Sequence, residues 1–176
     1  MAAPVPARKL PSGNTMPAIA LGVYQSAPGA ESYDAVLSAL KLGYRHIDTA
    51  TYYAKEADVG MAIRDAGLKR EEVFVTSKFF AIEWNNDEVL NGVQASVDKV
   101  GGYIDLYLSH APLNPVNRSE AWRALEAAQS KGLVRDIGVS NFGVAHLEKL
   151  SETWRVKPAV NQLELHPWAS HADIVE

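Results

Sequence analysis

An acid, a pair of tyrosines, a lysine and a histidine stand at or just beyond the ends of strand-like segments. Asp48 lies near the end of RHIDTA, with Tyr52 and Tyr53 a few residues further on, while Lys78 ends VFVTSK and His110 ends IDLYLSH. A carboxylate can hold an ammonium group, and an ammonium group favours the ionised form of a neighbouring phenol. Polar groups gathered at successive strand ends have the layout of an active site.

Two segments further along the chain continue this pattern. VRDIGVSN ends in Ser140 and Asn141, and AVNQLE carries Gln162 close to its end. The two amides can donate and accept hydrogen bonds, and the hydroxyl can do both with one oxygen. Ser140 and Asn141 also suit the start of a helix, where they would cap its first backbone N–H groups.

Composition limits the kind of protein to which such a site could belong. The chain has 176 residues, 47% of them hydrophobic, which is enough for one globular domain with a core. Its net charge of -4 and its lack of a basic cluster argue against nucleic-acid binding. The absence of cysteine excludes disulfides and thiolate metal sites and fits a reducing compartment. No apolar run approaches the roughly 18 residues of a membrane span, so we expect a cytoplasmic protein.

The segments that must position these residues alternate between strand and helix patterns. Residues 1–9 are expected to be a leader, and residues 10–176 to form one domain that opens with a hairpin around Gly13. Apolar runs predict six strands, at 18–24, 45–50, 73–79, 104–110, 134–140 and 158–165. Apolar residues at helical spacing predict helices at about 31–43, 57–66, 87–100 and 119–130, a short helix around Leu147, and the first turn of another at 170–176.

Alternating strands and helices predict an α/β fold whose parallel strands are joined by right-handed crossovers. Both a doubly wound open sheet and a (β/α)8 TIM barrel are built this way. No Gly-x-Gly-x-x-Gly motif follows the first strand, which argues against a dinucleotide-binding open sheet, and the polar strand ends favour the barrel. A complete barrel takes about 250 residues and eight units. Since the chain contains five units and a sixth strand, we expect an incomplete barrel.

Five segments resemble, in order, the signature motifs of the aldo-keto reductases: GYRHIDTATYYAKE, FVTSK, DLYLSHAP, IGVSNF and NQLELHP. The resemblance extends from about Leu10 to the end of the chain, and five motifs in matching order make it specific. It implies an NADPH-dependent reductase of aldehydes and ketones, built on a barrel of eight strands with an N-terminal β-hairpin over the bottom.

The resemblance also implies a catalytic set of Asp48, Tyr53, Lys78 and His110, in which Tyr53 is the general acid that protonates the carbonyl oxygen. Because tyrosine is a weak acid with an unperturbed pKa of about 10, we expect Lys78 to lower the pKa of Tyr53. Asp48 would hold the Lys78 ammonium, and His110 would orient the carbonyl. The residues that resemble the family's contacts to the nicotinamide carboxamide are Ser140, Asn141 and Gln162.

Other positions differ from residues that are common in the family. Tyr24 stands in place of a frequent Trp, Phe79 and Phe80 in place of a Leu-Trp pair, and Ala111 where many members have Trp after the histidine. We expect these four residues to line the substrate pocket, and the small Ala111 to widen it for a bulkier carbonyl. Lys55 stands where the family often has Asn, and we expect little effect from it.

The resemblance places the family's seventh and eighth strands, with the loops that hold the cofactor's pyrophosphate and 2′-phosphate, beyond Glu176. We therefore expect a truncated form that binds NADPH poorly and has little activity alone. Six strands would leave two unpaired sheet edges and an exposed apolar interior. These open edges are expected to favour self-association.

Each site residue also has a structural interpretation. Asp48 and Lys78 could form an ordinary buried ion pair, because structural ion pairs also occur in cores. Tyr53 could be a packing residue, with Tyr52 as its alternative in the catalytic role. His110 could be a core histidine with a satisfied ring nitrogen.

Two other classes of function remain open at this point. A metal-dependent barrel hydrolase would use His46, Asp48, His110 and His166 as ligands, but it would leave Lys78 and Tyr53 without a role. In a purely structural interpretation, His46 is a core residue and His166 pairs with Glu164 in a loop. The other class is a catalytically silent relative of the reductases that acts through a protein partner.

Overall fold

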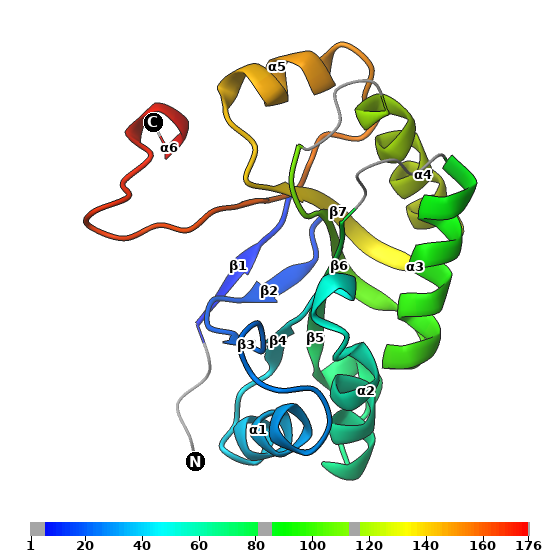
Figure 1. Cartoon of the computed structure of the whole chain (residues 1–176), viewed down its shortest axis with the longest axis vertical. Coiled ribbons are helices and arrows are strands. Elements are labelled where there is room, and N and C mark those ends of the chain that lie inside the picture. Colours follow the sequence, from blue (N-terminus) through cyan, green and yellow to red (C-terminus); the bar gives the residue numbers. More distant parts are fainter. Residues whose placement is uncertain (1–5, 81–85, 113–116, 176) are drawn as a thin grey trace.

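The computed structural model describes residues 6–80, 86–112 and 117–175 (Figure 1). Within these residues, six strands form one parallel sheet whose spatial order follows the chain, β3-β4-β5-β6-β7-β8. Their bounds are Leu21–Gly22 (β3), His46–Asp48 (β4), Phe74–Phe79 (β5), Ile104–Ser109 (β6), Val134–Ser140 (β7) and Asn161–Gln162 (β8). Chain-ordered parallel strands are the arrangement of a barrel, whereas the order reverses in a doubly wound sheet. The sheet is a curled half-barrel, and the predicted α/β fold of incomplete (β/α)8 type is confirmed.

A helix follows each of these strands, and the helices after β3 to β7 return the chain to the same end of the sheet, as parallel pairing requires. The helices are Ala30–Lys41 (α1), Glu56–Asp65 (α2), Asn86–Val100 (α3), Arg118–Ser130 (α4), Val144–Ser151 (α5) and Ala172–Val175 (α6), with 3-10 helices at Thr51–Tyr53 (η1) and Arg70–Glu72 (η2). Helices α1 to α4 contact one another in sequence along one face of the sheet (Figure 1). None of the helices in the described residues has the length and apolar character needed to cross a membrane.

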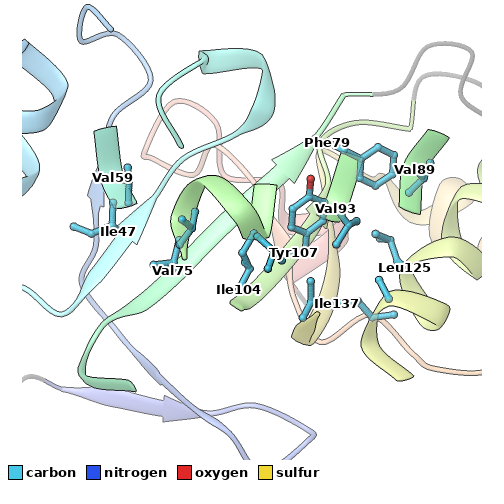
Figure 2. Close-up of a cluster of buried hydrophobic side chains, with 14 of the residues drawn as sticks. Ile47, Val59, Val75, Phe79, Val89, Val93, Ile104, Tyr107, Leu125 and Ile137 are labelled. Atoms are coloured by element: carbon cyan, nitrogen blue, oxygen red, sulfur yellow. The ribbon is translucent and has the colours of Figure 1, made fainter. Parts of the chain in front are cut away.

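The larger hydrophobic core lies between the sheet and these helices (Figure 2). Alternate side chains of each strand point to this side, because side chains alternate across a strand. Members contributed by the strands include Ile47, Val75, Phe79, Tyr107 and Ile137, and members contributed by the helices include Val59, Val93 and Leu125. Full burial of an aliphatic side chain of this size contributes about 1.5–3 kcal/mol, so this layer stabilises the sheet and helices as one unit.

A second cluster fills the opposite, concave face of the sheet. Strands Ala7–Lys9 (β1) and Thr15–Pro17 (β2) pair antiparallel as the predicted hairpin, and Asn14 Nδ2 donates to Asp136 Oδ2 of β7 at 2.7 Å. That hydrogen bond attaches the hairpin turn to the sheet near the start of β7. The buried residues of the cluster are Leu10, Phe74, Leu106 and Leu108, with Met16 and Val160 packed against them.

The hairpin corrects two expectations. Ala7–Lys9 forms strand β1, so the expected leader of residues 1–9 is wrong for this part of the chain. The interior of the curl was expected to be exposed, but Leu106 and Leu108 are only 2% and 0% exposed. The physical reason is that the hairpin itself supplies the apolar cover for that face.

Candidate active site

The carboxyl ends of the parallel strands surround a cavity of about 610 Å³. Parallel strands in chain order end at one rim, so residues far apart in sequence meet there. The catalytic and cofactor-binding residues predicted from the sequence that line the cavity are Asp48, Tyr53, His110, Ser140, Asn141 and Gln162. Aromatic side chains that share this lining are Tyr24, Tyr52 and Phe80.

Asp48, the last residue of β4, receives hydrogen bonds from the neighbouring strand β5 and from the more distant β8. Its Oδ1 accepts from Lys78 Nζ at 2.5 Å, and its Oδ2 accepts from Gln162 Nε2 at 2.8 Å. Lys78 lies on β5 with 1% of its side chain exposed and also donates to the carbonyl of Thr49 at 3.0 Å. Burial lowers the pKa of Lys78, whereas Asp48 opposes this shift. The expected role of Asp48 in holding the Lys78 ammonium agrees with this geometry.

Tyr53 reaches the cavity through the short turn that follows β4. The 3-10 helix η1 ends at Tyr53, and Ala54 next to it takes the left-handed conformation, with φ of 58°. This turn leaves Tyr52 at the rim, 67% exposed, and directs the more buried Tyr53 towards His110. The Tyr53 hydroxyl lies 3.4 Å from His110 Nε2, and its ring centroid lies 5.2 Å from Lys78 Nζ.

The environment of Tyr53 shifts its pKa in the direction opposite to the one expected. Burial raises the pKa of Tyr53 to about 12, and the nearby charge of Asp48 and the Tyr24 phenol add to the shift. Lys78 does not reverse it, because its ammonium is already paired with Asp48. The expectation that Lys78 lowers this pKa is therefore wrong for this structure.

His110 follows β6 and stands opposite the phenol across the cavity. Burial lowers the pKa of His110 to about 4, and the Lys78 charge acts in the same direction. The imidazole is therefore neutral at physiological pH. Its Nδ1 is buried and has no hydrogen-bond partner among the described residues.

Ser140, Asn141 and Gln162 are brought together by the pairing of β7 with β8. Asn141 has a φ of 62°, and its Nδ2 donates to the carbonyl of His110 at 2.9 Å and to Ser140 Oγ at 3.1 Å. Ser140 Oγ in turn donates to the carbonyl of Gln162 at 2.9 Å. The side-chain oxygens of Asn141 and Gln162 accept no hydrogen bond from the described residues, so both are free to accept one from a ligand.

Two of the four expected pocket residues are not in the cavity lining. Phe79 is 2% exposed and packs on the helix side of the sheet, where its ring stacks on Tyr107 at 6.2 Å between centroids (Figure 2). Strand alternation explains this, because Lys78 points into the curl and its neighbour must point out of it. Ala111 is half-buried but does not belong to the lining. Tyr24 and Phe80 do line it, and the Phe80 ring lies 5.5 Å from that of His110.

Lys55, from which the sequence analysis expected little effect, is a buried residue beside the site. It is 3% exposed, and its ammonium donates to the backbone carbonyls of Val23 and Tyr24 at 2.7 and 2.6 Å. The same ammonium lies 5.7 Å from the centroid of the Tyr53 ring. The one available signal was its position, two residues after the tyrosine chosen as catalytic.

The four ligands of the metal-hydrolase hypothesis do not gather. No group of three or more His, Asp or Glu side chains suited to a metal ion occurs in the parts of the chain that the structure describes. Both ring nitrogens of His46 are engaged, with the Pro17 carbonyl at 3.0 Å and Thr76 Oγ1 at 2.8 Å. His166 pairs with Glu164 at 2.9 Å, in agreement with the structural interpretation of these two residues.

The fold and the rim site together define a barrel-type α/β protein with a tyrosine, lysine, histidine and aspartate set. A model of the Aldo/keto reductase family matches residues 18–176, and the chain belongs to this family. Among curated relatives, an uncharacterised oxidoreductase, YtbE, of Bacillus subtilis is 42% identical and covers 94% of this chain. Glyoxal reductase of the same organism is 43% identical over 90% of the chain, and methylglyoxal reductase DkgA of Escherichia coli is 42% identical over 90%.

Solved structures give the same result. An aldo/keto reductase from Brucella melitensis superposes with a TM-score of 0.93 at 40% identity, covering 98% of this chain and 68% of that one. An aldo-keto reductase from Bombyx mori, in complex with NADP, has a TM-score of 0.88 at 36% identity, covering 99% and 62%. The chain spans 61%, 58% and 58% of the lengths of YtbE, glyoxal reductase and DkgA.

Proposed function

We propose that this protein reduces aldehydes or ketones to alcohols with NADPH, and that Tyr53 donates the proton to the carbonyl oxygen. The observation that carries the proposal is the convergence of Tyr53 and His110 on one cavity, 3.4 Å apart, beside the Asp48–Lys78 pair. Membership of the aldo-keto reductase family supports the reaction class.

Tyr53 suits the role of proton donor because it holds its proton at every physiological pH, with a pKa of about 12. The negative charge that grows on a carbonyl oxygen during reduction makes that oxygen a stronger base than a phenolate, so transfer from Tyr53 is downhill. Neutral His110 can donate one ring N–H to the carbonyl oxygen and so orient it.

Ser140, Asn141 and Gln162 would hold the nicotinamide carboxamide of the cofactor. The residues fit, because the free side-chain oxygens of Asn141 and Gln162 can accept the carboxamide N–H groups, while Gln162 Nε2 retains a second N–H for the carboxamide oxygen. When bound, reduced nicotinamide supplies the hydride for the carbonyl carbon. The NADP in the Bombyx mori relative supports this cofactor.

The substrate class follows from the cavity and from the relatives. Glyoxal and methylglyoxal reductases are among the similar proteins, which supports reactive aldehydes as substrates. The rim tyrosines Tyr24 and Tyr52 add exposed aromatic surface, so an aldehyde with an apolar or aromatic group would gain contact area there.

We also propose that the chain associates with itself along the two outer strands of the sheet. In the described residues β3 and β8 are each paired on one side only, and unpaired strand edges are templates for another chain. Exposed apolar residues flank both edges, with Ile19 53% and Leu165 57% exposed.

The test of the reductase proposal is the rate of NADPH oxidation by the purified protein with glyoxal, methylglyoxal and an aromatic aldehyde. Tyr53→Phe should lower this rate by a factor on the order of 10²–10⁴, the usual contribution of a general acid. NADPH affinity, measured by fluorescence, should stay near the wild-type value. Tyr44→Phe removes a phenol hydroxyl outside the cavity and serves as the matched control. Equal rates for wild type and Tyr53→Phe would exclude Tyr53 as the proton donor.

A further inference from the structure

Lys55 carries a buried charge in an unfavourable place. It occupies the N-cap position of α2, where the positive end of the helix dipole disfavours a cation. Its ammonium forms no ion pair with a carboxylate within the described residues, and its acceptors are the two backbone carbonyls of Val23 and Tyr24. A buried charge is costly unless its contacts compensate it. The stability of α2 does not explain this lysine, whereas its contacts with the cavity wall offer a reason for its placement.

The two carbonyls belong to the loop that joins β3 to α1. Val23 is also held by the sheet, because its N–H donates to the carbonyl of Asp48 at 3.1 Å. Tyr24 lies one residue beyond that anchor. Among the described residues, Lys55 is the hydrogen-bonding partner that holds the backbone of Tyr24. The far end of the loop is fastened separately, by Asp58, which accepts from Gly29 N at 2.8 Å.

Tyr24 forms part of the cavity wall and touches the proposed proton donor. Its ring centroid lies 4.9 Å from that of Tyr53 at an interplanar angle of 48°, although 59% of Tyr24 is exposed. An exposed ring on a loop keeps such a contact only when its backbone is held in place. The Lys55 ammonium binds that backbone and faces the Tyr53 ring at 5.7 Å.

We infer that Lys55 is a positioning residue of this site, which fixes Tyr24 against Tyr53 and thereby sets the wall that contacts the substrate. The inference deepens the proposed reductase function and rests on it. Lys55 acts through Tyr24 and transfers no proton, so its loss affects substrate binding more than the chemical step.

The first measurement compares Lys55→Met with wild type in reductase kinetics. Methionine keeps the length and the apolar stem but removes the ammonium. The KM for an aromatic aldehyde should rise about tenfold, which matches the free energy of one lost aromatic contact, with a smaller change in kcat. Lys55→Arg retains the cation and should recover part of the loss.

Two further variants separate this role from a purely structural one. Asp58→Ala releases the far end of the same loop and the start of α1, where Ser32 Oγ also donates to Asp58 at 2.8 Å. It should lower the unfolding midpoint but leave KM near the wild-type value. Tyr24→Ala should raise KM about as much as Lys55→Met, and the double variant should show no further rise, because both changes remove one wall.

Hydrogen exchange of the backbone amides in residues 24–29 gives a readout that needs no activity. Lys55→Met should speed this exchange and Lys55→Arg should slow it again. Wild-type KM together with wild-type exchange in Lys55→Met would overturn the inference. If Lys55→Met does not fold, the KM of Tyr24→Ala is the deciding measurement, because Tyr24 is largely exposed and its loss should not prevent folding. An unchanged KM in Tyr24→Ala would overturn the inference. A wild-type protein that oxidises no NADPH would instead refute the reductase proposal. The exchange data would still test whether Lys55 holds the backbone of Tyr24.

Discussion

The neutral imidazole of His110 links the site to the stability of the fold. Its folded pKa of about 4 lies below the unfolded value of about 6.5, so the unfolded chain binds more protons between these limits. Stability should therefore fall as the pH is lowered from about 6.5 to about 4. His110→Gln removes this titration and should show a smaller fall, measured as urea unfolding midpoints at several pH values.

Two comparisons control the histidine prediction. Burial also lowers the pKa of His46, so this histidine too makes stability fall as the pH is lowered. Its contribution is the same in wild type and in His110→Gln, and it cancels when the two are compared. His171 is exposed, and His171→Gln should follow the wild-type curve. Identical pH dependence in His110→Gln and wild type would contradict the predicted link.

At the level of single residues, the sequence located much of the site and missed its electrostatics. Period-two alternation and polar strand ends were enough to bring Asp48, Lys78 and His110 to one rim. The same alternation, applied to the neighbour of Lys78, would have excluded Phe79 from the pocket. The raised pKa of Tyr53 could not be predicted, since it depends on burial that only the packed structure defines.

At the level of elements, the bounds of the helices and of the central strands β5 to β7 were predicted more closely than those of the outer strands. Helix α3 begins at Asn86 against an expected 87 and ends at the predicted Val100. The first strand was expected over 18–24, but only Leu21–Gly22 pairs, because β3 has one neighbour in the described sheet. Apolar periodicity marks a helix along its length, whereas strand limits depend on a partner that local sequence does not reveal.

The close contact between α2 and α3 requires glycine, which has no side chain, at position 60. A Cβ added at Gly60 would collide with the carbonyl oxygen of Lys99 and lie 2.9 Å from that of Val100. Gly60→Ala should therefore lower the free energy of unfolding by about 1–3 kcal/mol, the usual cost of overpacking, as measured by urea denaturation. Gly22→Ala is the matched control, because its added Cβ meets nothing within 4 Å. Equal stability of Gly60→Ala and wild type would show that the two helices separate easily.

For the whole molecule, the hairpin explains why the concave face is not an exposed apolar surface. The hairpin was predicted and the family resemblance placed it over the bottom of the barrel, but its packing into the curl was not predicted, since the buried cluster joins Leu10 to Leu106 and Leu108, far apart in the chain. The hydrogen bond between Asn14 and Asp136 spans a similar separation. Long-range contacts of this kind leave no periodic signal in the sequence.

The proposed association along the outer strands makes a prediction about the whole molecule. The weight-average mass in sedimentation equilibrium should rise with protein concentration. Charges next to open strand edges oppose edge pairing, so the double variant Ile19→Lys/Leu165→Lys should associate less. Met61→Lys places the same charge on an exposed residue of α2, away from both edges, and should behave as wild type. A monomeric mass at every concentration would rule the association out.

The carboxylate of Asp48 accepts one hydrogen bond from β5 and another from β8, although three strands separate β8 from β4. Lys78 lies on the strand next to β4, but Gln162 reaches Asp48 only once the sheet has bent to its native curvature. A partly folded chain with a flat sheet, or with β8 detached, would lack the assembled set of polar groups. Simultaneous formation of these two hydrogen bonds would therefore report that the sheet has reached its native form.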